Sequence, residues 1–188
     1  MKTFVKPLRS FFAVLSITSL LSLGFASNGW TASAKEIDAG AQAALDKLYN
    51  EVSTGKDLVA KAKGVLVFPF VIKAGIGIGG EYGEGVLLIN GKPDAYYSTV
   101  SASVGLQLGA QKKSIVLLFM EDSALRSFKS SSGWQAGVDA SVAVVTLGVG
   151  GSMDTSKYKE PILGFIIGQA GLMYNLSLEG AKITKIDR

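Results

Sequence analysis

Glycine recurs through the stretch from Lys61 to Ile89 in a pattern that few folds accommodate. The stretch reads KAKGVLVFPFVIKAGIGIGGEYGEGVLLI, so that an apolar run, a glycine-rich middle and a second apolar run follow one another. Because glycine has no side chain, a strand face made of glycines lets another backbone or an aromatic ring lie close. The glycines that we expect to form this structural signature are Gly64, Gly75, Gly79, Gly80, Gly83 and Gly85.

The remaining pattern predicts one domain of the α+β class. The segment from Lys35 to Tyr49 has the spacing of an amphipathic helix, with Ile37, Leu45 and Leu48 on its apolar face. About seven or eight short strands follow, separated by glycine-rich or charged turns. We therefore predict an N-terminal amphipathic helix packed on a curved, glycine-rich, mainly antiparallel β-sheet that approaches a barrel or a sandwich.

Particular residues mark where these elements should turn or end. Pro69 cannot donate a hydrogen bond to a neighbouring strand, so it predicts a strand end, an edge or a bulge. Asn90-Gly91 is typical of a tight hairpin turn, and Lys112-Lys113 is expected to form a charged turn. The apolar run from Ser114 to Met120 predicts a central strand, and the segment from Glu121 to Phe128 predicts a short helix.

The first 34 residues have the organisation of a secretory signal peptide. A basic start precedes an apolar run from Phe11 to Phe25, and Ala32-Ser33-Ala34 fits a small-x-small cleavage site. Gly24-Phe25-Ala26 is a second candidate site, and an uncleaved anchor is a further alternative, although the apolar run is short for a membrane span. We expect cleavage after Ala34, export to the periplasm or the outside, and a single domain over residues 35–188.

Composition removes several classes of function. The chain has no histidine and no cysteine, so nucleophile systems with histidine and the usual zinc sites cannot be built, and no cysteine is available for a lipid anchor. Residues 1–34 hold three basic and no acidic residues, so the net charge falls from +4 for the whole chain to +1 for the rest. This balance does not indicate nucleic-acid binding. We predict no catalytic residue, no metal site and no cofactor.

Two short motifs resemble functional sites but lack their context. Gly75-x-Gly77-x-x-Gly80 fits the dinucleotide-binding pattern. The residues after it are poor helix formers, so they cannot supply the helix N-terminus that holds a pyrophosphate. Glu81 and Glu84 lie close together as glycosidase carboxylates do, but the glycines on either side favour a solvated loop.

Lysines flank the first predicted strand, and the most suggestive of them are Lys61, Lys63 and Lys73. Beside exposed apolar groups, such lysines attract anionic lipid by about 1 kcal/mol per residue near a membrane. Ordinary surface lysines are the alternative. An outer-membrane β-barrel is a rival architecture, although its strands should alternate apolar and polar residues, and several strands predicted here are continuously apolar.

The order of these motifs resembles the SYLF domain family. The resemblance covers residues 40–186 and rests on Ala60-Lys61-Ala62-Lys63-Gly64, Val71-Ile72-Lys73-Ala74-Gly75, Gly79-Gly80, Gly83-x-Gly85, Ser103 to Gly109, and Ser177-Leu178-Glu179-Gly180. It implies a noncatalytic lipid-binding domain. Eukaryotic members bind phosphoinositide-containing membranes, and yeast-type members also engage actin.

The resemblance implies a membrane-binding role for the helix and for the lysines beside the signature. The tentative lipid-binding residues are Ile37, Leu45, Leu48, Lys61, Lys63 and Lys73. Because export would separate the protein from actin and phosphoinositides, envelope phospholipid or another amphiphile is the expected partner, at a surface patch or in an internal pocket. A structural or protein-interaction domain of the envelope, without lipid dependence, is the alternative function.

Overall fold

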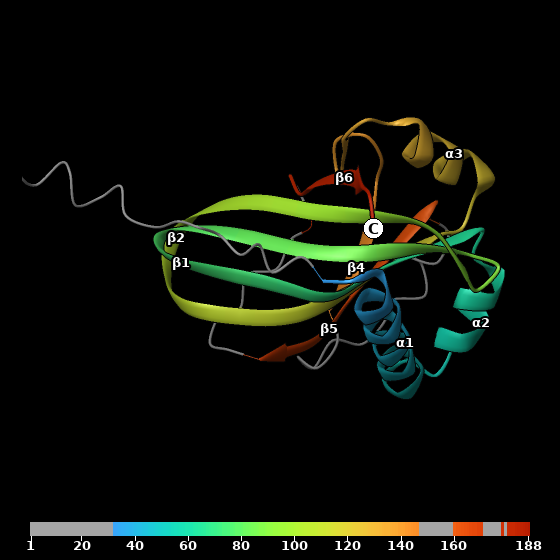
Figure 1. Cartoon of the computed structure of the whole chain (residues 1–188), viewed down its shortest axis with the longest axis horizontal. Helices are drawn as coiled ribbons and strands as arrows, with labels where there is room; N and C mark the ends of the chain where they lie inside the picture. Colours follow the sequence, from blue (N-terminus) through green and yellow to red (C-terminus); the bar gives the residue numbers. More distant parts are fainter. Residues whose placement is uncertain (1–31, 147–159, 171–177, 179) are drawn as a thin grey trace, which may run out of the picture. The chain divides into compact units, whose positions relative to one another are not determined.

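The computed structural model describes residues 32–146, 160–170, 178 and 180–188. Their elements are α1 (Ala34–Glu51), α2 (Gly55–Lys61), β1 (Gly64–Ile89), β2 (Lys92–Phe119), α3 (Asp122–Ser130), β3 (Trp134–Gln135), β4 (Ala143–Thr146), β5 (Ile162–Ala170) and β6 (Lys182–Ile186) (Figure 1). The predicted signal peptide up to Thr31 lies outside the described residues, as do residues 171–177.

Two very long strands form the centre of the fold. β1 and β2 contain 26 and 28 residues, and they pair antiparallel from Ile89 opposite Lys92 to Gly64 opposite Phe119. Asn90 and Gly91 turn the chain between them with φ angles of 50° and 73°. Positive φ at both positions is the geometry that favours Asn-Gly in a two-residue hairpin. The predicted hairpin turn is therefore confirmed.

These two strands replace several short strands that the sequence predicts. The ladder continues through the glycine-rich middle, with changes of register between Phe68 and Val71, between Ile76 and Ile78, and between Leu87 and Leu88. The first change confirms the irregularity expected at Pro69. The charged turn expected at Lys112-Lys113 is wrong, because both lysines pair with β1 inside the ladder. Glycine curves a strand without ending it, and this property hides the continuity of the strand from a reading of the sequence.

The long hairpin bends so that the first and second halves of β1 come into contact, and glycines make room for this contact. A Cβ atom added to Gly83 would lie 2.7 Å from Cγ2 of Val71, and one added to Gly85 would collide with the carbonyl oxygen of Val67. Only a residue without a side chain permits an approach this close. The close backbone approach expected from the glycine signature is thus found within β1 itself.

The other strands complete the sheet on the second edge of β2. β6 pairs with Tyr96–Val100, and β5 pairs with β2 between Lys112 and Phe119. β3 then pairs with β6, and β4 pairs in parallel with β5. The order is β3-β6-β2-β5-β4, with β1 also on β2. The curved, mainly antiparallel sheet and the α+β class are confirmed, as is the central strand at Ser114–Met120.

Helix α1 covers one face of this sheet, which we call the outer face. Its buried residues form one cluster with side chains of β1, β2 and β5, and they are Ile37, Ala41, Ala44, Leu45 and Leu48. A capping box closes the first turn. The backbone N–H of Glu36 donates to the hydroxyl of Ser33, and the backbone N–H of Ser33 donates to the carboxylate of Glu36 at 2.8 Å.

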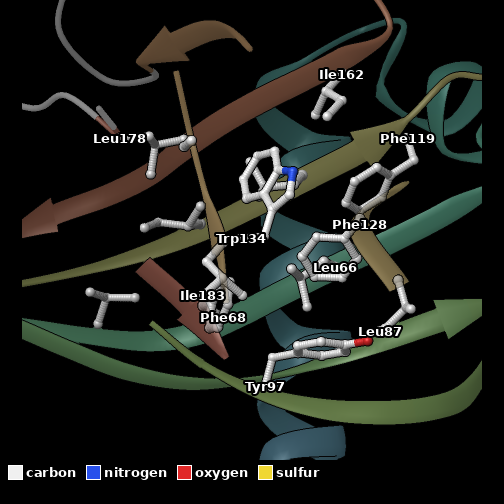
Figure 2. Packing of buried hydrophobic residues seen from close by; sticks show 14 of the residues in the cluster. Leu66, Phe68, Leu87, Tyr97, Phe119, Phe128, Trp134, Ile162, Leu178 and Ile183 are labelled. Atoms are coloured by element: carbon white, nitrogen blue, oxygen red, sulfur yellow. The ribbon is translucent and has the colours of Figure 1, made fainter. Parts of the chain in front are cut away.

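A second cluster fills the opposite, inner face of the folded hairpin (Figure 2). Phe128 of α3 contributes its ring to the middle of this cluster. Its centroid lies 4.8 Å from those of Tyr97 and Phe119 and 5.6 Å from that of Trp134. The short helix predicted near Glu121–Phe128 is confirmed as α3, and its one buried residue anchors it to the sheet.

Candidate functional site

The six residues predicted to bind lipid do not form one surface. Ile37, Leu45 and Leu48 are buried between α1 and the sheet, with exposed fractions of 1%, 4% and 0%. Lys61 and Lys63 are exposed, beside the end of α2 and the start of β1. Lys73 is buried in β1. As packed here, α1 has no free apolar face to place in a membrane.

An exposed apolar patch lies instead on the outer face of the long hairpin. Phe70 and Ile72 are 47% and 50% exposed, and they share one face because they are two residues apart in a strand. Lys112 lies opposite Ile72 in the ladder, and its ammonium is 4.2 Å from the centroid of the Phe70 ring. We call these three residues the outer patch.

The outer patch borders α1, where that helix leaves the sheet uncovered. An added Cβ on Gly40 of α1 would lie 2.8 Å from Cβ of Pro69 and 3.0 Å from Cε2 of Phe70. The helix and the start of the patch are therefore in close contact. The patch combines an aromatic ring, a branched aliphatic chain and a cation, which is the chemistry of a membrane interface.

A second exposed pair lies farther along the hairpin. Tyr82 and Val100 face each other across the ladder and are 47% and 51% exposed. The Tyr82 hydroxyl donates to Glu84 at 2.7 Å. Burial first, and then the hydrogen bond and charge of Glu84, raise the pKa of Tyr82 to about 12. This tyrosine therefore keeps its proton up to a higher pH than a free tyrosine does.

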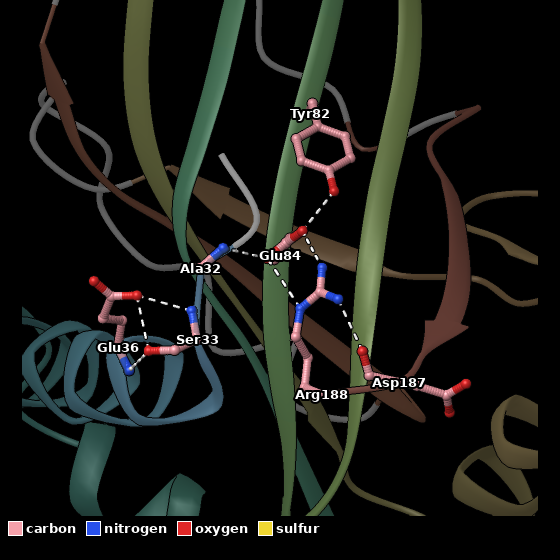
Figure 3. A network of polar contacts seen from close by, with 7 residues as sticks. All are labelled: Ala32, Ser33, Glu36, Tyr82, Glu84, Asp187 and Arg188. Carbon is pink, nitrogen blue, oxygen red and sulfur yellow. Dashed lines mark hydrogen bonds and ion pairs between the residues drawn. The ribbon is translucent and has the colours of Figure 1, made fainter. Parts of the chain in front are cut away.

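Glu84 joins three parts of the chain (Figure 3). Its carboxylate accepts hydrogen bonds from Tyr82, from the backbone N–H of Ala32 at 3.1 Å, and from the guanidinium of Arg188, which also makes an ion pair with it. The solvated loop expected at Glu81 and Glu84 is therefore wrong. Both residues are buried within β1. Residues three apart in a strand point to opposite faces, so these carboxylates cannot act as a catalytic pair.

A pocket of about 320 Å³ lies between α1, α2 and the hairpin turn. Leu45, Tyr49, Val59, Ala62, Leu88 and Asn90 are among the residues that line it. Its volume is at the lower end of the range for small-molecule sites. Lys56 lies near it, with its ammonium 5.8 Å from the centroid of the Tyr49 ring. This pocket is a feature of the described residues that fits the internal-pocket alternative.

Comparison with known proteins identifies a family for the second part of the chain. The family model Ysc84, described as Las17-binding protein actin regulator, matches residues 100–188. The matched part contains most of β2 and every later element. It does not contain α1 or β1, on which much of the sequence resemblance rests. No curated protein matches the chain.

Proposed function

Through residues 100–188 the chain belongs to the Ysc84 family, the SYLF family, and from this premise we propose that the protein is a noncatalytic lipid-binding protein that docks on phospholipid membranes. The observation that carries the proposal is the outer patch. A half-exposed aromatic ring and a half-exposed isoleucine lie beside a lysine on a rigid sheet. Exposed apolar side chains can enter the lipid interface while a cation meets the phosphates.

The proposal assigns attachment to the sheet rather than to α1. Burial of the apolar face of α1 leaves that helix as the support of the patch. Within the described residues no helix has the length and apolarity needed to cross a bilayer. The family description names an actin regulator. We propose envelope phospholipid as the partner here, because the predicted export would keep the protein away from actin.

The test is sedimentation of the purified protein with vesicles. Anionic and zwitterionic vesicles are compared at low and high salt, for the natural protein and for Phe70→Ser/Ile72→Ser. We expect the natural protein to sediment with anionic vesicles, less so at high salt. The double variant should bind roughly tenfold or more weakly, because each half-exposed side chain contributes on the order of 1 kcal/mol when it is buried in lipid.

Val138→Ser is the matched control, since Val138 is 70% exposed and lies outside the outer patch. It should bind as the natural protein does. Equal binding by the natural protein and the double variant would remove the patch from the mechanism and direct attention to the pocket beside Tyr49. No sedimentation with either kind of vesicle would favour an envelope interaction domain without lipid dependence.

A further inference from the structure

Two lysines and one carboxylate are buried together on the inner face of the folded hairpin. The ammonium of Lys113 lies 2.9 Å from Oε2 of Glu81, and their side chains are 1% and 7% exposed. Lys73 keeps only 7% of its surface exposed. We call these three residues the inner lysine cluster.

The fold-back of β1 brings the cluster together. Lys113 lies opposite Val71 in the ladder, and Lys73 lies opposite Gln111. Alternate residues of a strand share a face, so both lysines point to the inner side. Glu81 is two residues from Gly83, whose missing side chain admits Val71. The contact of Val71 with Gly83 therefore places the carboxylate of Glu81 against Lys113.

Within the part of the chain that the structure describes, the cluster carries two positive charges and one negative charge. Among the described residues, Lys73 makes no hydrogen bond or ion pair. Among the described residues, Glu81 is therefore the carboxylate that an ion pair joins to this cluster of two lysines. Burial lowers the pKa of Lys113, the nearby charge of Glu81 opposes this change, and the like charge of Lys73 lowers the pKa further. A buried charge without a partner is costly, and a bound counter-ion removes that cost.

We propose that Lys73 and Lys113 bind an oxyanion, a phosphate or carboxylate group, on the inner face of the hairpin. Lysine ammonium groups are strong donors to such oxygens. The ammonium of Lys113 has three N–H donors, and its ion pair with Glu81 leaves donors for a second acceptor. Lys73 is the less buried of the two lysines, at 7% exposed against 2% for Lys113. Glu81 holds Lys113 in place and sets the net charge of the site at +1.

The inference rests on the proposed function in one respect only. If the protein binds lipid, the oxyanion is the headgroup of an amphiphile. Binding is measured by calorimetry with three probes: inorganic phosphate, dihexanoyl phosphatidic acid below its micellar concentration, and uncharged octyl glucoside. We expect the first two to bind and the third not to bind. A lipid that binds roughly tenfold more tightly than phosphate identifies a headgroup site, because its chains also bury apolar surface. Equal affinities identify a site for free phosphate.

Two substitutions should act in opposite directions. Lys73→Met removes one ammonium but keeps an apolar chain of similar length, and it should weaken oxyanion binding roughly tenfold or more. Glu81→Gln removes the competing negative charge and should tighten binding. Lys185→Met is the control, because Lys185 is exposed on β6, and its affinity should match that of the natural protein. Melting temperatures without probe show that each variant is folded.

Failure to bind phosphate and phosphatidic acid, or unchanged affinity in Lys73→Met, would overturn the inference. Neither outcome affects the vesicle experiment, which depends on Phe70 and Ile72. A protein that sediments with vesicles but ignores soluble oxyanions keeps the proposed function and loses the inner site. A protein that binds soluble oxyanions but not vesicles keeps the inner site and loses membrane docking.

Discussion

Gly83 sets the distance between the two halves of β1. We expect Gly83→Ala to lower the free energy of unfolding by about 1–3 kcal/mol, the usual cost of forcing atoms into a packed region. The added methyl group would press on Cγ2 of Val71 at 2.7 Å and on the carbonyl oxygen of Phe70 at 2.9 Å. The measurement is urea denaturation followed by circular dichroism.

Gly80 provides the matched control in the same strand. A Cβ atom added there meets nothing within 4 Å, so Gly80→Ala should leave the stability within about 0.5 kcal/mol of the natural value. Equal losses in the two variants would show that glycine is needed for strand curvature in general and not for the contact between the halves of β1.

At this scale the sequence predicts which residues are unusual but not which residues they meet. The spacing of glycine correctly predicts close backbone approach, yet nothing in it identifies Val71 as the partner of Gly83. The partners of Glu81 and Glu84 are also distant in sequence, at Lys113 and Arg188. A local reading therefore mistakes these two buried carboxylates for loop residues.

The capping box of α1 is the clearest stabilising device at the scale of an element. Ser33→Ala should lower the free energy of unfolding by about 1 kcal/mol, because it leaves a helix N–H group without its acceptor. Denaturation curves of this variant are compared with those of Ser53→Ala, which changes an exposed serine in the turn after α1 and should have little effect.

The same cap has a pH dependence. The carboxylate of Glu36 accepts hydrogen bonds from the backbone N–H and from the hydroxyl of Ser33. These two bonds, the backbone one first, lower the pKa of Glu36. The stabilisation is therefore present above the ordinary pKa of a glutamate and is lost as the pH falls through the lowered value. Natural protein and Glu36→Gln should become more alike in stability under acid conditions. A difference that persists unchanged in acid would show that the carboxylate charge plays no part in the cap.

The sequence predicts well those elements that a short stretch of residues specifies by its spacing or its turn residues. The helical period identifies α1, and Asn90-Gly91 identifies the turn between β1 and β2. The lengths of β1 and β2 are missed because glycine usually interrupts a regular strand. Here pairing with a second long strand supports the backbone through the glycine-rich middle.

Across the described part of the molecule, four tyrosines hold their protons more tightly than free tyrosine does. Burial raises the pKa of Tyr49, Tyr82, Tyr96 and Tyr97, and that of Tyr82 reaches about 12. Above pH 10, the ordinary value for tyrosine, the unfolded chain ionises while the folded chain keeps its protons. Their contribution to the free energy of unfolding is therefore complete below pH 10 and is lost as the pH rises through their raised pKa values.

We expect the urea midpoint to fall over this interval, with tyrosinate absorbance appearing together with unfolding. Tyr82→Phe/Tyr96→Phe should show a shallower fall, because two of the four groups no longer titrate. At neutral pH this variant also loses the hydrogen bonds to Glu84 and Asp38, so the comparison is between slopes and not between absolute stabilities. Parallel slopes for the two proteins would contradict the assignment.

The candidate site belongs to the scale of the whole domain, and for that reason the sequence misses it. Phe70 and Ile72 lie in an apolar run that has the composition of a strand buried on both faces. Both are about half exposed, although Gly40 of α1 contacts Pro69 and the edge of the Phe70 ring. The sequence predicts Lys73 as a lysine at the surface, but Lys73 is buried because the hairpin folds over it.

The cap of α1 also bears on where a processing enzyme can cut. A signal peptidase acting after Ala34 would remove Ser33 and the Ala32 N–H that donates to Glu84. It would also leave a new α-ammonium group in the first turn of α1, where the helix dipole is already positive. A cut after Ala26 would keep the cap and place the new charge outside the helix. The sequence alone favours cleavage after Ala34, whereas the cap favours the second candidate site, after Ala26. The intact mass of the processed protein distinguishes a chain beginning at Ser27 from one beginning at Lys35, and we expect it to correspond to Ser27.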